Sequence, residues 1–274
     1  MNSKPIMVAS HPRSGTHLVL DTLRRQFPTA RSQRMFGRPL DHLYLNIERL
    51  TSEFRPFSDE LAGKILSAVP NPLMKTHYLA DLSETWVAEE TGKLAGKWRE
   101  AVAGAHVLYV HRDPREVMVS YKQFLSPDHA DVADITLGAF LRRPHWNGRD
   151  TMLEWWVRHV ESWLAVPGIM PFGFRELTSD PHATLAAIGA HIGRTPDMRE
   201  PFLPKKPSSI NRQRLNRLLS LAPSSTAIIA DAKRFPAPNW HVASTDDDVS
   251  YLQQIAGPLM ERLGYDPGAY SPAR

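Results

Sequence analysis

The first residues of the chain that could do chemistry are Arg13, Ser14, Gly15 and Thr16, which lie between an apolar run and a segment with helical spacing. A guanidinium, two hydroxyls and a glycine that lets the backbone approach closely can together bind a phosphate. The free N–H groups at a helix start and the helix dipole favour an anion at the same place. We therefore expect a phosphate-binding loop here, although an ordinary polar strand-to-helix turn would have a similar composition.

This loop is not a Walker A sequence. The Walker A pattern, GxxxxGK[ST], requires a lysine directly after its last glycine, whereas Gly15 is followed by Thr16. The cation of this loop, Arg13, comes before the glycine instead. The pattern therefore favours a phosphate site of another kind than that of the ATP-binding P-loop proteins.

A second polar group, Lys75-Thr76-His77, ends a short apolar segment that begins at Pro72. Histidine has an unperturbed pKa suited to accepting a hydroxyl proton near neutral pH, and a lysine can offset negative charge that develops during a group transfer. A single histidine is usually structural, but one that ends a strand between two anion-binding loops is a candidate general base. His17 and His111 are its rivals, and we expect both to bind phosphate or to pack.

The third polar group is Arg112 with Ser120, eight residues further on. Arg112 follows an apolar run, and Ser120 lies about two turns into the helix predicted after Asp113-Pro114. Both side chains can therefore reach one dianionic phosphate, the arginine bidentately. The alternative is that Arg112 pairs with Asp113 or Glu116 and that the serine is incidental.

Apolar runs alternate with helical patterns along the whole chain, which indicates an α/β fold with a central parallel sheet flanked by helices. No linker divides the sequence, so we expect a single domain over residues 1–274. Ligands bind beyond the carboxyl ends of the strands in such sheets, and all three polar groups follow predicted strands. We expect the strands at Ile6–Ala9, Pro72–His77, Ala105–Val110 and Met170–Arg175.

Helices must hold these strand ends in place, and capping residues define several of them. Beginning with the helix that starts at Leu18, we expect further helices at Leu40–Leu50, Ser58–Val69, Leu82–Glu90, Arg115–Leu125, Thr151–Val166, Pro181–Ile192 and Asp246–Leu263. Residues 127–148 are predicted to form a loop-rich insertion, in which Phe140 and Trp146 either line an apolar pocket or pack.

The composition excludes several classes of protein. Hydrophobic residues make up 42% of the chain and charged residues 23%, as in a soluble globular protein, and no apolar run is long enough for a membrane span. Cysteine is absent, which excludes disulfides and thiolate zinc sites. The net charge of +4 is a mild bias toward anionic ligands and too weak to indicate nucleic acid. We expect a cytoplasmic protein, since the N-terminus has no signal peptide.

The three polar groups resemble those of sulfotransferases that use 3′-phosphoadenosine 5′-phosphosulfate (PAPS). Pro-Arg-Ser-Gly-Thr, ending at Thr16, resembles their 5′-phosphosulfate loop. The spacing of Arg112 and Ser120 is that of their 3′-phosphate motif, and Lys75-Thr76-His77 matches a Lys-Thr-His in which the histidine is the general base. The resemblance extends over nearly the whole chain and implies a P-loop NTPase-like fold, with PAPS as co-substrate and no metal.

The resemblance also implies a role for each site residue. His77, Lys75 and Arg13 would be catalytic. The residues that would bind PAPS are Arg13, Ser14, Gly15, Thr16, His17, Arg112 and Ser120, joined by Lys233 and Arg234 from a C-terminal loop that closes over the 3′-phosphate.

The chain departs from the family at several places: Arg13 stands where many members have a lysine, and the family's dimer motif has no counterpart. His17 and Leu18 replace a Thr-Trp pair, so the tryptophan that stacks on adenine is missing. Phe235 and Pro238 replace the two glycines of the C-terminal loop, which leaves the conformation of that loop open.

We expect sulfonate transfer from PAPS to a hydroxyl, or less favourably an amine, of a small-molecule or carbohydrate acceptor. Residues 31–55 and 127–149 would shape the acceptor site, and neither the acceptor nor the oligomeric state can be read from the sequence. The alternatives are a P-loop kinase that uses ATP and a non-catalytic nucleotide-binding protein of the same fold.

Overall fold

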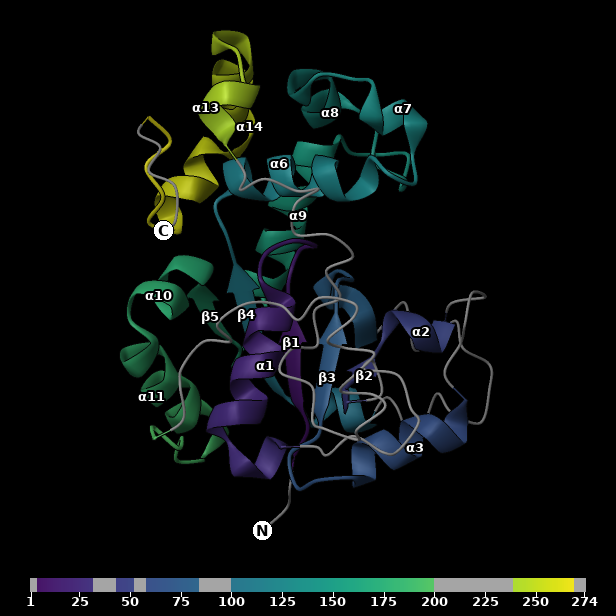
Figure 1. Cartoon of the computed structure of the whole chain (residues 1–274), viewed down its shortest axis with the longest axis vertical. Coiled ribbons are helices and arrows are strands. Elements are labelled where there is room, and N and C mark those ends of the chain that lie inside the picture. Colours follow the sequence, from purple (N-terminus) through teal and green to yellow (C-terminus); the bar gives the residue numbers. More distant parts are fainter. Residues whose placement is uncertain (1–3, 32–42, 52–57, 84–99, 200–238, 269–274) are drawn as a thin grey trace, which may run out of the picture.

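The computed structural model describes residues 4–31, 43–51, 58–83, 100–199 and 239–268. Their centre is a five-stranded parallel sheet with the strand order β2-β3-β1-β4-β5 (Figure 1). The strands are β1 (Ile6–Ala9), β2 (Leu45–Asn46), β3 (Leu73–Thr76), β4 (His106–His111) and β5 (Met170–Gly173). The α/β fold with a central parallel sheet is therefore confirmed.

The register of the sheet brings the three polar groups to one edge. Ala9, the last residue of β1, pairs with Thr76 of β3 and with Tyr109 of β4. The residues that follow these strands therefore leave the sheet at nearly the same level. Because β1 is the middle strand, its loop lies between the other two groups.

Helices cover both faces of the sheet through two apolar clusters. Val8, Leu108 and Val110 belong to one cluster, which contains side chains of α1, α10 and α11. Met7 and Tyr109 belong to the other, which contains side chains of α3, α6, α9 and α14. The helices are α1 (Thr16–Gln26), α2 (Glu48–Thr51), α3 (Asp59–Ser67), α6 (Pro114–Leu125), α7 (Ala130–Ala133), α8 (Leu137–Arg142), α9 (Met152–Leu164), α10 (Phe174–Ser179), α11 (Pro181–Ile192), α13 (Trp240–Ala243) and α14 (Asp246–Arg262), with 3-10 turns η1 (Pro28–Ala30) and η3 (Ala80–Ser83).

Helix caps fix several boundaries that the sequence indicated. The Ser58 side chain accepts a hydrogen bond from the N–H of Leu61, and Gly193 ends α11 in the left-handed conformation. Thr151 and Glu154 form a reciprocal capping box at the start of α9. This box stabilises the beginning of a helix that is central to the candidate site.

Three expectations about local structure were wrong. Leu40–Leu50 was expected to be a helix, but its described part contains β2 and three of the four residues of the short helix α2. Backbone pairing of Leu45 with Met74 stabilises a strand there, a long-range contact that helical spacing does not reveal. The expected loop-rich insertion contains α7 and α8, and the strand expected to reach Arg175 ends at Gly173, where α10 begins.

Some predicted segments lie outside the described residues. The helix expected at Leu82–Glu90 is described only as far as residue 83, and the tail at 200–238 is not described. Among the residues that the structure describes, no helix is both long and apolar enough to span a membrane.

Candidate active site

The loop between β1 and α1 is shaped by two residues in the left-handed backbone region. Arg13 has φ 70° and Gly15 has φ 104°. The hydroxyls of Ser10 and Thr16 are 2.5 Å apart across the loop, and the N–H of Ser14 donates to the carbonyl of His11. A left-handed turn directly before a helix directs successive N–H groups toward one point, which is the geometry of an anion cradle.

This cradle, formed by the loop from Ser10 to Thr16, contains a hydrogen-bond donor that no other described residue uses. The hydroxyl of Ser14 is buried and has no hydrogen-bond partner among the described residues. The first N–H groups of α1 also lack partners within their own helix. A buried, unsatisfied hydroxyl is costly, so this loop fits a phosphate that would accept from Ser14 and from the start of α1.

Two guanidinium groups meet beside the cradle, and the one that bonds Ser120 is that of Arg13. Arg13 Nε donates to Ser120 Oγ at 3.1 Å, and Arg112 Nη1 donates to the carbonyl of Arg13 at 3.4 Å. Loss of surrounding water and the nearby Arg112 lower the pKa of Arg13. An anion between the two cations would relieve this repulsion.

Arg112 also makes the ion pair that was the alternative interpretation of its motif. Its Nε donates to Glu116 Oε2 at 2.6 Å, and its guanidinium lies 4.4 Å from the centre of the Phe174 ring. Asp113, the other suggested partner, instead caps α6 and pairs with Arg115. The pair with Glu116 and the stack on Phe174 hold Arg112 at the cradle, so the ion pair and an anion-binding role are compatible.

His77 is hydrogen-bonded directly to the phosphate loop. Its Nδ1 lies 2.7 Å from the carbonyl oxygen of Ser10. A carbonyl can only accept, so Nδ1 carries the ring proton and Nε2 keeps its lone pair. The ring is therefore fixed in the tautomer that can accept a proton at Nε2.

Glu48 is a site residue that the sequence analysis missed. One of its carboxylate oxygens accepts from the hydroxyl of Thr76 at 2.9 Å and from the N–H of His77. The other lies 4.0 Å from Nζ of Lys75. Glu48 thus orients all three residues of the Lys-Thr-His group. Its position inside an expected helix, with no motif around it, gave no signal of this role.

A model of the sulfotransferase domain matches residues 3–221 of the chain. The chain belongs to the sulfotransferase family. Comparison with curated proteins found no match.

Two solved structures share the fold of this sulfotransferase. Mouse sulfotransferase SULT7A1, solved with PAP (adenosine 3′,5′-bisphosphate), aligns with a TM-score of 0.52 and 14% identity over 95% of this chain and 84% of that chain. Retinol dehydratase, solved with androsterone and the inactive cofactor PAP, aligns with a TM-score of 0.51 and 16% identity over 95% of this chain and 82% of that chain. At these identities the likeness establishes the fold alone.

Burial and neighbouring cations set the charge state of the sulfotransferase's site. Burial, followed by the charge of Lys75, lowers the pKa of His77 well below 6.5. Burial also lowers the pKa of Lys75, and Glu48 partly opposes this. His77 is therefore neutral at pH 7. An anion bound nearby would raise the pKa of His77, because it would stabilise the charged ring.

The two rival histidines have different surroundings. His17 lies near the cations of the cradle, where burial, Lys75 and Arg13 lower its pKa to about 3. His111 bonds another part of the chain: its Nδ1 lies 2.8 Å from the hydroxyl of Tyr265, and burial lowers its pKa to about 4.

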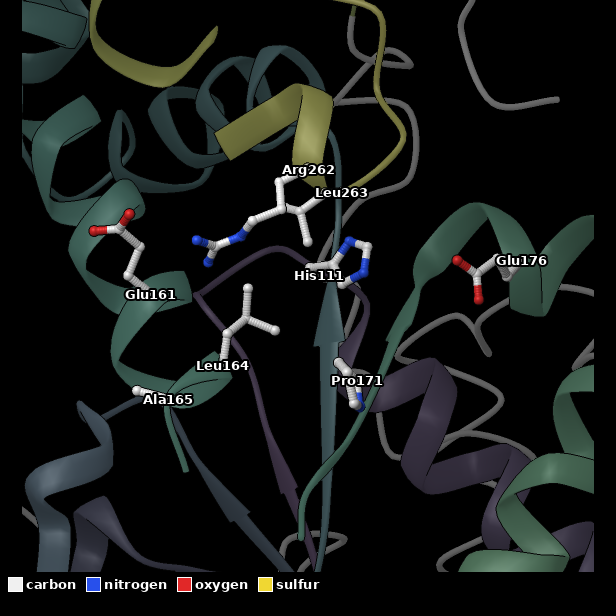
Figure 2. A pocket seen from close by; sticks show the side chains of 8 residues that line it. All are labelled: His111, Glu161, Leu164, Ala165, Pro171, Glu176, Arg262 and Leu263. Atoms are coloured by element: carbon white, nitrogen blue, oxygen red, sulfur yellow. The ribbon is translucent and has the colours of Figure 1, made fainter. Parts of the chain in front are cut away.

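His111 lines a separate hollow of about 620 Å³ beside the ends of β4, β5, α9 and α14 (Figure 2). None of its lining residues comes from the phosphate loop or the Lys-Thr-His group; they are His111, Glu161, Leu164, Ala165, Pro171, Glu176, Arg262 and Leu263. The geometry therefore favours His77 over His111 as a base beside the cradle.

The remaining sequence expectations have mixed outcomes. Phe140 is fully buried and packs in the core, whereas Trp146 is 53% exposed. Lys233, Arg234, Phe235 and Pro238 lie outside the described residues. Within the described part of the chain, no three His, Asp or Glu side chains come together as a metal site would require.

The buried histidines make the sulfotransferase sensitive to acid. His11 and His159 are fully buried. Burial lowers the pKa of His159 to about 3, and burial together with His159 lowers the pKa of His11 well below 6.5. Because the unfolded chain binds these protons near pH 6.5, the folded state loses stability as the pH falls below that value.

We expect these groups to leave the free energy of unfolding unchanged above about pH 7, since neither state then binds their protons. Between pH 7.5 and 5.0, His11 and His159 should each lower the free energy of unfolding by about 2 kcal/mol. Urea unfolding at several pH values measures this dependence. A free energy of unfolding that stays constant down to pH 5.0 would contradict it.

Proposed function

We propose that this sulfotransferase transfers a sulfonate group from PAPS to a hydroxyl of a small-molecule or carbohydrate acceptor, with His77 as the general base. The observation that carries the proposal is the hydrogen bond from His77 Nδ1 to the carbonyl of Ser10. It fixes the proton-accepting nitrogen beside the loop that fits a phosphate. Two structures of the same fold were solved with PAP, the product that PAPS leaves after transfer.

Each part of the site has a task in this proposal. Ser14, Gly15, Thr16 and the start of α1 hold the 5′-phosphate, with His17 beside them. Arg13 neutralises the charge that develops on the leaving phosphate oxygen. Arg112 and Ser120 bind the 3′-phosphate, and Arg13 joins the two phosphate sites through its bond to Ser120. Lys233 and Arg234 would complete the 3′-phosphate site.

PAPS supplies the sulfonate: a bond forms between the acceptor oxygen and sulfur, and the bond from sulfur to the 5′-phosphate oxygen breaks. His77 Nε2 takes the acceptor proton as the new bond forms. Lys75 offsets the negative charge on the transferring oxygens, and Glu48 orients Lys75. The arginines and the lysine supply the positive charge that balances the leaving phosphate and the transferring sulfonate. The proposed mechanism therefore uses no metal ion.

Exposed aromatic side chains near the cradle support an acceptor with an apolar ring face. Phe124 is 51% exposed, and its ring centre lies 4.9 Å from the guanidinium carbon of Arg13. Trp146 contacts Tyr121, which in turn contacts His11 of the phosphate loop. Such surfaces bind flat or weakly polar rings.

Thermal unfolding with nucleotides tests the proposal. PAP at about 100 times its dissociation constant should stabilise the protein by about 2.7 kcal/mol, or roughly 5–10 °C, because both phosphate sites are filled. AMP lacks the 3′-phosphate and should therefore give a much smaller shift at the same concentration.

Equal shifts with PAP and AMP would remove Arg112 and Ser120 from the proposed 3′-phosphate site. A shift with ATP and Mg²⁺ alone would favour a kinase. No shift with any nucleotide would favour a non-catalytic protein of the same fold.

A further inference from the structure

Helix α9 presents three polar side chains to the backbone that follows the proposed base. His159 Nε2 lies 3.1 Å from the carbonyl oxygen of His77. One turn later, Ser162 Oγ accepts from the N–H of Ala80 at 3.3 Å, and Trp163 Nε1 donates to the carbonyl of Tyr78 at 2.9 Å. Residues spaced by three and four along a helix share one face. This face of α9 therefore binds the backbone from residue 77 to residue 80.

The ring of His159 has a defined tautomer. Its Nε2 must be protonated, since the carbonyl of His77 can only accept. Its Nδ1 then accepts from the hydroxyl of Tyr109, at 3.1 Å. His159 and Tyr109 are both fully buried, and their rings stack with centres 5.9 Å apart. Both ring nitrogens of a neutral imidazole are thus satisfied in one orientation.

The backbone of His77 is consequently held from both sides. Glu48 of α2 accepts from its N–H, His159 of α9 donates to its carbonyl, and the loop carbonyl of Ser10 accepts from its ring. These three contacts come from three separate elements. Together they fix the peptide planes and the ring, and so the direction in which Nε2 points.

We propose that His159 is a positioning residue that orients His77 for proton transfer. The inference rests on the proposed function, because it gives His159 a role only through the proposed base. His159 lies too deep to touch an acceptor and acts through the carbonyl of His77. Without its N–H, that partly buried carbonyl would have to find another partner, and the backbone at His77 would shift.

The fold has other means of holding α9 in place. The capping box of Thr151 and Glu154 fixes its start, and Arg158 pairs with Asp150 at 2.7 Å. Trp156, fully buried on the same helix, packs without making a hydrogen bond through its Nε1 among the described residues. Packing alone at position 159 could be met by an aromatic hydrocarbon, so what the two ring nitrogens add is the contacts to Tyr109 and to the carbonyl of His77.

The substitution His159→Phe tests the proposal, because it keeps a ring that can stack on Tyr109 and removes both nitrogens. The readout is the ring tautomer of His77 in ¹⁵N-histidine-labelled protein with PAP, assigned by comparison with His77→Ala. We expect a single Nδ1–H form in the unsubstituted chain and a mixture of both forms in His159→Phe. His159→Gln, which keeps a side-chain N–H donor, should restore the single form in part.

Turnover gives a second readout, with 4-nitrophenol as the probe acceptor. We expect His159→Phe to lower kcat by roughly 10- to 100-fold while the dissociation constant of PAP and the KM for PAPS stay within about twofold. Trp156→Phe is the matched control, because it disturbs the packing of α9 without touching His77. Trp156→Phe should lose about as much stability as His159→Phe. It should leave the His77 tautomer and kcat unchanged.

A single, unchanged Nδ1–H form of His77 in His159→Phe would overturn the proposal, as would an equal loss of kcat in Trp156→Phe. If His159→Phe fails to fold, His159→Leu replaces it, since it also removes both ring nitrogens. The tautomer readout separates this inference from the proposed function. If His77→Ala keeps its turnover, the base assignment fails, while the spectra still report whether His159 fixes the His77 ring.

Discussion

Replacing His77 with alanine is expected to lower turnover by roughly 10²- to 10⁴-fold while leaving the affinity for PAP nearly unchanged. The imidazole supplies a lone pair at Nε2 that the bond from Nδ1 to the carbonyl of Ser10 fixes beside the phosphate loop. It supplies none of the donors of the proposed phosphate sites. Turnover and PAP-induced thermal stabilisation, measured on the same variant, separate these two effects.

The pH dependence of kcat/KM gives an independent check of this prediction. A base must be unprotonated, so activity falls as the pH drops through its pKa. Burial and Lys75 lower the pKa of His77, so the acid limb of the free enzyme should lie below pH 6.5, and His77→Ala should lose this limb.

The variant His17→Ala is the matched comparison, since His17 lies near the same cations. We expect it to weaken PAP binding and to keep most of the turnover at saturating nucleotide. The opposite pattern, with turnover lost in His17→Ala and kept in His77→Ala, would transfer the role of base to His17.

The sequence was sufficient to predict the convergence of the three polar groups. Each one follows a buried apolar run, and parallel strands place such positions at one edge of the sheet. The pairing of Ala9 with Thr76 and Tyr109 confirms this placement. The prediction depended only on local sequence patterns and on a general rule of parallel sheets. Neither requires knowledge of particular side-chain contacts.

The contacts between these groups could not be predicted in this way. Glu48 orients the Lys-Thr-His group, and His159 binds the carbonyl of His77 from a helix 82 residues further along the chain. Such bonds depend on the packing of helices against the sheet, which residue spacing does not encode. For the same reason the sequence left Phe140 and Trp146 equivalent, whereas packing buries the first and exposes the second.

Arg112 shows why competing interpretations of a motif need not exclude one another. Its pair with Glu116 is the local contact that helical spacing suggests, at 2.6 Å. The same side chain also reaches the carbonyl of Arg13 and stacks on Phe174. A guanidinium has five N–H donors, so one ion pair orients it and leaves others for a ligand.

The substitution Gly15→Ala is expected to abolish most of the stabilisation by PAP and to weaken PAP binding by at least about tenfold. A left-handed backbone costs an alanine roughly 1–2 kcal/mol. In addition, a Cβ at this position would lie 2.4 Å from a ring carbon of Phe174. The loop or the Phe174 ring must therefore move, and that ring also holds Arg112. One methyl group should thus disturb both proposed phosphate sites.

Gly168→Ala is the matched control for Gly15→Ala. Gly168 also has a left-handed backbone, with φ 76°, but a Cβ there would meet no atom within 4 Å. Both variants should lose stability through backbone strain, whereas only Gly15→Ala should lose affinity for PAP, as isothermal titration can measure. Unchanged PAP binding in Gly15→Ala would mean that the left-handed turn before α1 is not the phosphate cradle. The unused hydroxyl of Ser14 would then need another explanation.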